Sequence, residues 1–187
     1  MARSNGRGIF RRHMKPHLVL ATILITSLSV HAAEPTYAAA APTELDYRKD
    51  NNSYLLVLKP GQKVMESLMA FMEKEKLPGA QFTAIGAVKN TEVAYYNLET
   101  KTYQPKKFEA SGEVLSLNGS LGYFDNKPVA HAHIALAGPD FTVYGGHLRE
   151  AEVSLVLEIF ITPTSERIVR ELNTDFPGLK TINLEAK

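Results

Sequence analysis

Three histidines have the residue type and spacing that best suit metal chemistry in this chain. His131 and His133 are two residues apart, and His147 follows the second of them. Side chains at i and i+2 of a β-strand project from the same face, so His131 and His133 would point the same way. A turn around Gly138-Pro139-Asp140 would bring the next strand back and place His147 near the pair. Three converging imidazoles with an open fourth position form the arrangement of a catalytic zinc site.

The histidines also have a less specific interpretation. Two histidines on an exposed sheet face are common, and His147 could be a turn residue that hydrogen-bonds to backbone. Every histidine beyond residue 32 nevertheless lies in this one stretch, which favours a shared site. The chain has no cysteine. Thiolate ligands and disulfides are therefore excluded, and a metal would be held by histidine nitrogen and carboxylate oxygen.

Two further side chains could support a site of this kind. Glu113 could orient a metal-bound histidine or act as a general base; a solvent-facing strand residue is the alternative. Tyr144 could donate a hydrogen bond to a bound ligand, or it could pack against the core as an aromatic strand residue.

Hydrophobic periodicity locates the elements that must position these residues. Helical spacing of apolar residues predicts one main helix over 63–76, ended by Pro78-Gly79. A short helix is expected over 165–172, and Gly145-Gly146 is expected to end a strand. Apolar runs predict strands at 54–58, 82–88, 93–98, 103–109, 112–117, 129–137, 141–144, 153–161 and 181–184. This pattern predicts an α+β fold on a mostly antiparallel β-sheet, with one main helix and a short C-terminal helix.

Residues 1–32 have the pattern of a secretory signal peptide. Five basic residues and no acidic residue precede and flank an apolar run from Leu18 to Val30, and Val30-His31-Ala32 resembles a signal peptidase site. The run is shorter than the roughly 20 residues of a membrane-spanning helix, so no stable membrane anchor is expected. The protein is therefore expected to be exported, to a periplasm or outside the cell.

The remainder is expected to contain a flexible leader and one domain. Residues 33–52 are rich in Ala, Pro and Thr without a period, which is typical of a leader. Residues 53–187 would then form the domain. The complete chain has a net charge of +1, but residues 33–187 hold 16 basic and 20 acidic residues, a balance of −4 with histidine neutral. Nucleic-acid binding depends on clustered Lys and Arg, so such a partner is not expected.

Several segments, taken in order, resemble the PPC (plants and prokaryotes conserved) domain family. They are Tyr54 to Gln62, Ser67 to Phe71, Ala84 to Val88, Tyr95 to Tyr103, Gly112 to Gly119, His131-Ala132-His133 and Gly145 to Leu148. The resemblance covers about residues 53–162. It implies an α+β fold around an antiparallel sheet, usually assembled as a homotrimer. In prokaryotic members the histidines of H-x-H and G-G-H form a metal site, which implies that role for His131, His133 and His147.

Four functions remain open at this point. The first is an exported protein that binds zinc, or another divalent metal, and has a small-ligand pocket. The second is a zinc-dependent lyase or hydrolase of a small oxygen-rich substrate, because the PPC fold and its H-x-H…H site are similar to those of acetolactate decarboxylase. The third is a binding or structural module with incidental histidines. DNA binding, as in plant relatives with AT-hooks, is disfavoured because the chain lacks an R-G-R-P hook.

Overall fold

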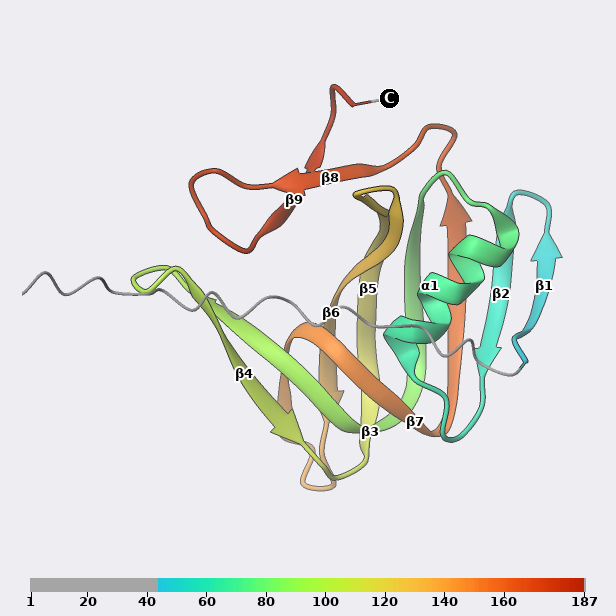
Figure 1. The fold of residues 1–187 in the computed structure, drawn as a ribbon. Coiled ribbons are helices and arrows are strands. Elements are labelled where there is room, and N and C mark those ends of the chain that lie inside the picture. Colours follow the sequence, from blue (N-terminus) through green and yellow to red (C-terminus); the bar gives the residue numbers. More distant parts are fainter. Residues whose placement is uncertain (1–43, 187) are drawn as a thin grey trace, which may run out of the picture. The chain divides into compact units, whose positions relative to one another are not determined.

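The computed structural model describes residues 44–186, which form a nine-stranded sheet and one helix (Figure 1). The order along the sheet is β1-β2-β7-β3-β5-β8-β9, while β4 pairs with β3 and β6 pairs with both β5 and β7. The pairs are antiparallel except β5–β8. The strands are β1 (Asp46–Asp50), β2 (Ser53–Leu58), β3 (Ala80–Asn97), β4 (Thr102–Phe108), β5 (Gly112–Phe124), β6 (Lys127–Ala137), β7 (Val143–Pro163), β8 (Val169–Leu172) and β9 (Lys180–Asn183). The predicted α+β class with a largely antiparallel sheet is confirmed.

Four strands pair in a closed circuit, because β3 and β6 each pair with both β5 and β7. Strand β7 is long enough to change partners along its length. Its first residues, Val143 to His147, pair with β6, and the strand pairs with β3 from His147 onward. His147 therefore lies where three strands meet, opposite both His133 and Ala94.

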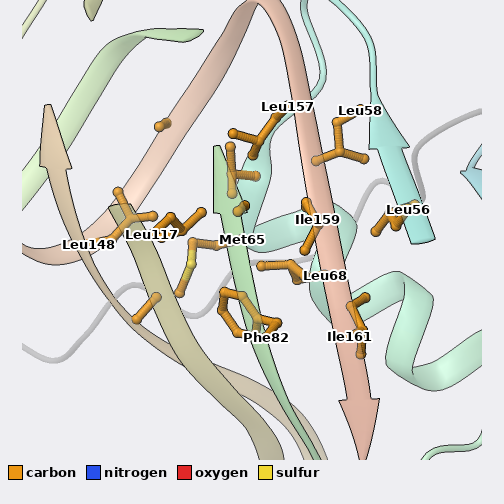
Figure 2. Packing of buried hydrophobic residues seen from close by; sticks show 14 of the residues in the cluster. Leu56, Leu58, Met65, Leu68, Phe82, Leu117, Leu148, Leu157, Ile159 and Ile161 are labelled. Atoms are coloured by element: carbon orange, nitrogen blue, oxygen red, sulfur yellow. The ribbon is translucent and has the colours of Figure 1, made fainter. Parts of the chain in front are cut away.

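The helix α1 (Val64–Glu75) covers one face of the sheet and buries its apolar side there. Figure 2 shows Met65 and Leu68 within a cluster of buried side chains that come from β2, β3, β5 and β7. The backbone N–H groups of Met65 and Glu66 donate to the Glu150 carboxylate at 2.9 and 3.3 Å, which satisfies donors at the helix start. The helix ends at Lys76, whose φ of 53° is left-handed. The predicted helix over 63–76 is confirmed to within one residue at each end.

Two pairs of predicted strands are each one continuous strand in the structure. The segments 82–88 and 93–98 both belong to β3, and 141–144 and 153–161 both belong to β7. Register shifts between Ala84 and Gly86, and again beyond Gly86, bend β3 without ending it. The prediction that Gly145-Gly146 ends a strand was wrong, because both glycines pair with β6.

The predicted helix over 165–172 was also wrong. Val169–Leu172 form strand β8, which pairs with β9. Tertiary contacts override the helical pattern here. Ile168 accepts a hydrogen bond from the Tyr123 N–H at 2.8 Å and donates to the Pro78 carbonyl at 3.1 Å, which fixes an extended backbone. A hydrophobic pattern read along one segment does not contain these distant partners.

The ordered domain begins earlier than residue 53. Asp46–Asp50 form β1, which pairs with β2, so the predicted flexible leader over 33–52 was wrong for these residues. The Tyr47 hydroxyl donates to Glu75, which ties β1 to α1. The predicted signal peptide, residues 1–32, lies outside the described residues. Among the described residues, no helix has the length and apolar character needed to cross a membrane.

Candidate metal centre

The sheet brings the three predicted histidines together. His131 and His133 lie on β6 and alternate with buried Ala132 and Ile134, so the histidine side chains point away from the core. His147 on β7 lies directly opposite His133. The sequence-based expectation that a hairpin would place all three side chains together is confirmed.

The turn between β6 and β7 sets this register. The Gly138 N–H donates to the Thr142 carbonyl at 3.1 Å, and the Asp140 carboxylate accepts from the Thr142 N–H and hydroxyl at 3.0 and 2.9 Å. These bonds also lower the pKa of the Asp140 carboxyl below its usual value. The turn leaves Ala137 opposite Val143, and four pairs further along His133 meets His147.

Two glycines allow the neighbouring strands to approach β6 closely. A Cβ at Gly145 would overlap the carbonyl oxygen of Ile134, and a Cβ at Gly119 would overlap the carbonyl oxygen of His131. Any side chain at either position would push a neighbouring strand away from the histidine-bearing strand. Both glycines therefore help to hold the histidines at their observed separation.

The three rings form a compact triangle. Ring centroids are 5.4 Å apart for His131–His133, 5.0 Å for His131–His147 and 5.6 Å for His133–His147. One nitrogen from each ring lies within 4.8 Å of the others. Two nitrogens bound to one zinc ion in a tetrahedral site lie about 3.3–3.4 Å apart, because each Zn–N bond is about 2.0–2.1 Å. Small side-chain rotations would close the difference, so the group could hold a metal ion.

Tyr103 covers one side of this triangle. Its ring lies 5.1 Å from the His147 ring at 33°, and Tyr96 packs edge-on against Tyr103 at 5.1 Å. These tyrosines pair across β3 and β4, and β3 pairs with β7. The sequence does not reveal the position of this pair beside His147, because the β3–β7 register joins residues more than fifty positions apart.

Glu113 is not at the histidines. It lies opposite Ala137, four residues along β6 from His133, which is about 13 Å at about 3.3 Å per residue. Glu113 instead borders a shallow hollow with Glu158, around Ile85, Leu115 and Val156. These last three residues are referred to below as the apolar patch. Ile85 and Leu115 are 55% and 52% exposed, although both lie within strands.

Tyr144 also lies apart from the histidines. Its ring stacks on Phe108 at 4.2 Å, and it packs against the hydrophobic core. Its cross-strand partner is the buried Leu136, which places the two side chains on the core side of the sheet. Of the two interpretations of Tyr144, the structure supports core packing.

Ser120 and Arg170 are near the histidines but were not identified from sequence. Ser120 on β5 lies directly opposite His131. Arg170 on β8 is only 5% exposed and donates to the Ser120 hydroxyl at 2.7 Å. A serine and an arginine fifty residues apart carry no shared spacing signal, so only the tertiary structure reveals the pair.

Comparison with known proteins identifies the fold. A protein from Pyrococcus horikoshii, described as a plant- and prokaryote-conserved (PPC) protein, is 30% identical with a TM-score of 0.66; the match covers 79% of this chain and 99% of that one. A metal-containing protein from Archaeoglobus fulgidus is 35% identical with a TM-score of 0.65, covering 75% and 96%. A protein from Bacteroides thetaiotaomicron named a "putative dna binding protein" is 27% identical with a TM-score of 0.72, covering 76% and 99%.

The family assignment rests on sequence as well as structure. No curated protein matches this chain. Residues 45–165, by contrast, match the sequence pattern of the Plants and Prokaryotes Conserved (PCC) domain, and this range contains all three histidines. The chain therefore belongs to the Plants and Prokaryotes Conserved domain family.

Proposed function

We propose that this protein binds one divalent metal ion, zinc in the first instance, through His131, His133 and His147. The observation that carries the proposal is the convergence of three imidazole nitrogens within 4.8 Å on the side of the sheet away from the core. The 35% identical relative from Archaeoglobus fulgidus is described as metal-containing, which supports the same function.

The donor set determines which ions suit the site. Imidazole nitrogen binds zinc, copper, iron and nickel well, and it is a poorer ligand for magnesium and calcium. Three neutral imidazoles leave the full positive charge of the ion in place and leave at least one coordination position for another ligand. When bound, such an ion supplies Lewis-acid polarisation of a ligand oxygen. We infer that a small oxygen-containing ligand occupies this position.

The proposal is for binding rather than for catalysis. A lyase or hydrolase needs an acid or base within hydrogen-bond reach of the reacting atoms. Glu113 and Tyr144, the two candidates from sequence, lie away from the histidines. DNA binding is not proposed either, because residues 33–187 have a net charge of −4 with histidine neutral.

Assembly and export are parts of the same proposal. We propose a homotrimer that buries the apolar patch, since exposed Ile85 and Leu115 lie next to each other on one sheet surface. Export rests on the basic and apolar pattern of residues 1–32.

The test is metal content per subunit of residues 33–187, purified without a histidine tag and measured by mass spectrometry after zinc loading and dialysis. We expect about one equivalent in the natural sequence and almost none in a His131→Ala/His133→Ala double variant. Lys127→Ala, an exposed residue at the first position of the same strand, is the control and should retain the metal. Equal metal content in the double variant and the natural sequence would contradict the proposal.

A further inference from the structure

The segment after residue 165 contacts residues that lie on either side of the histidine triangle. On one side, Arg170 donates to Ser120, whose strand partner is His131. On the other side, the connection between β8 and β9 contacts the β3–β4 hairpin, where the Tyr96 hydroxyl donates to the Pro177 carbonyl at 3.1 Å. Tyr96 packs on Tyr103, and Tyr103 lies against His147. This segment lies beyond the part of the chain that matches the family, residues 45–165.

The connection is held in place by several contacts of its own. The Asn173 side chain accepts from the N–H groups of Asp175 and Phe176 at 2.9 and 3.0 Å. The Lys101 ammonium donates to the Asp175 carbonyl at 3.0 Å and lies over the Phe176 ring. In Figure 1 the connection between β8 and β9 extends toward the tip of the β3–β4 hairpin. These contacts give the segment a defined position beside the histidines.

Arg170 brings a positive charge to this position. Its guanidinium is buried, donating to the Ser120 hydroxyl at 2.7 Å and to the Lys180 carbonyl at 2.8 Å. A hydroxyl can accept one hydrogen bond and still donate its own proton. Ser120 accepts from Arg170, so its O–H remains able to donate on the side of the sheet shared with His131. Directly opposed residues have Cβ atoms about 4.5–5.5 Å apart, which places this donor next to the candidate metal ligands.

We propose that Arg170 and Ser120 recognise the carboxylate of a small organic acid that binds at the three-histidine site. The inference rests on the proposed function, because the same ligand would fill the open position of the metal. A divalent ion with neutral ligands gives a positive site, which selects an anion, and the buried Arg170 guanidinium fixes the Ser120 hydroxyl beside it. Ser120 would contact the carboxylate directly, and Arg170 would orient and polarise the Ser120 hydroxyl.

A carboxylate fits the surroundings better than a phosphate. Phosphate sites commonly combine several cations or the N–H groups at a helix start. The start of α1, the helix of the described residues, is occupied by the Glu150 carboxylate. Beside the histidines, the Ser120 hydroxyl oriented by the Arg170 guanidinium suits a carboxylate group. Other oxygen atoms of the same ligand would then reach the metal.

The experiment measures binding of three probes by calorimetry to the zinc-loaded protein and to the zinc-free protein. The probes are L-lactate, its uncharged amide lactamide, and inorganic phosphate. For the natural sequence with zinc we expect lactate to bind at least about tenfold more tightly than lactamide, the size of one charge-assisted hydrogen bond. Tighter binding of phosphate than of lactate, or equal binding of lactate and lactamide, would overturn the inference.

Arg170→Gln tests the residue itself. We expect it to retain the zinc content of the natural sequence and to lose the preference for lactate over lactamide. Arg167→Gln is the matched control, because Arg167 lies on the same segment but packs on Tyr123 and donates to Asn126. The control should keep the full preference. An unchanged preference in Arg170→Gln would mean that the arginine only holds β8 in place, and the inference would fall.

Two readouts keep the inference separate from the proposed function. If Arg170→Gln does not fold, as judged by its melting temperature, Ser120→Ala decides. Several-fold weaker lactate binding at unchanged zinc content supports the inference, and unchanged binding overturns it. If neither the natural sequence nor any variant binds zinc, the proposed function is wrong independently of the inference. The zinc-free arm then judges the inference, since lactate binding that Arg170→Gln abolishes would support it and equal binding would overturn it.

Discussion

The side of the sheet that faces away from the core carries two regions with different chemistry. At one end of β5 and β6, His131, His133 and Ser120 bring together nitrogen and hydroxyl groups. At the other end of β5 lies the apolar patch, where Ile85 and Leu115 are about half exposed and carboxylates are found only at the border. The same strands thus present a polar site suited to a ligand and an apolar surface suited to another protein subunit.

The difference between these regions shows how one sheet can separate two tasks. Alternation along each strand fixes which side chains face outward, and position along the strand decides which region they join. Register shifts in β5 and β3 lie beside the apolar patch, between Val114 and Ser116 and between Ala84 and Gly86. The β6–β7 pairing that places His133 opposite His147 is regular. A change in one region should therefore leave the other intact, and the following predictions test that independence.

The largest effect is expected from His147→Ala, which removes one of three metal ligands. We expect zinc affinity to fall by more than about a hundredfold, beyond the 10–100-fold typical for residues that only support a ligand. Competition with a chromophoric chelator measures the affinity. The oligomeric state should not change. Affinity within a few-fold of the natural sequence would show that His147 is not a ligand.

Ile85→Glu and Leu115→Glu are each expected to have a large effect on the oligomeric state and none on zinc affinity, the reverse of His147→Ala. Each change places a charge in a surface that we propose to be buried in a trimer, where an apolar side chain contributes about 1.5–3 kcal/mol. Sedimentation velocity should show monomers in place of trimers, and zinc affinity should remain that of the natural sequence. If both variants remained trimeric, the apolar patch would not be the subunit interface.

A smaller effect on both stability and metal binding is expected from Gly145→Ala. The added Cβ would overlap the Ile134 carbonyl oxygen, so β6 and β7 must separate at the Gly145–Ala135 pair, two pairs from His133 and His147. Overpacking of this kind costs about 1–3 kcal/mol, which thermal unfolding would detect, and zinc affinity should fall with it. Gly61→Ala, where a Cβ would have open space but φ is +89°, controls for backbone strain alone and should leave zinc affinity unchanged.

The smallest effect is expected on the pH dependence of stability, through Glu152, which lies in neither the histidine site nor the apolar patch. Lys63, Lys89 and Asn90 surround the Glu152 carboxylate and lower its pKa to about 2. A depressed folded-state pKa contributes stability above the unfolded value, and this contribution is lost as pH falls toward the folded value. The melting temperature of the natural sequence should therefore exceed that of Glu152→Gln at pH 7, and the difference should shrink between about pH 4.5 and pH 2.

Glu150 makes the comparison with Glu152→Gln necessary. Burial raises the pKa of Glu150, so its contribution has the opposite dependence, present at low pH and lost as pH rises. Subtracting the Glu152→Gln curve removes this shared contribution. A difference in melting temperature that stayed constant across the acid range would contradict the assigned role of Glu152.

Local pattern was enough to predict the histidine site in outline. The i, i+2 spacing of His131 and His133 fixes their common face. The turn at Gly138 joins two strands that are consecutive in the chain, so the register with His147 depends on nearby residues. The helix could also be predicted, because its apolar period and its end signal lie within one segment. These features depend on residues close together in the chain.

Features that depend on distant pairing could not be predicted. Tyr103 reaches His147 through the β3–β7 register, and Arg170 reaches Ser120 across fifty residues. The expected helix over 165–172 failed for the same reason, since Ile168 is fixed by Pro78 and Tyr123. The exposure of the apolar patch could not be predicted either, because the sequence alone does not distinguish an exposed apolar strand residue such as Leu115 from a core residue.

The most direct test of the metal site is anomalous X-ray diffraction from crystals of the zinc-loaded protein, with data on either side of the zinc absorption edge. We predict one anomalous peak per subunit, about 2.0–2.1 Å from a nitrogen of each of His131, His133 and His147. A peak held by other residues, or no peak at the three histidines in zinc-loaded crystals, would contradict the account.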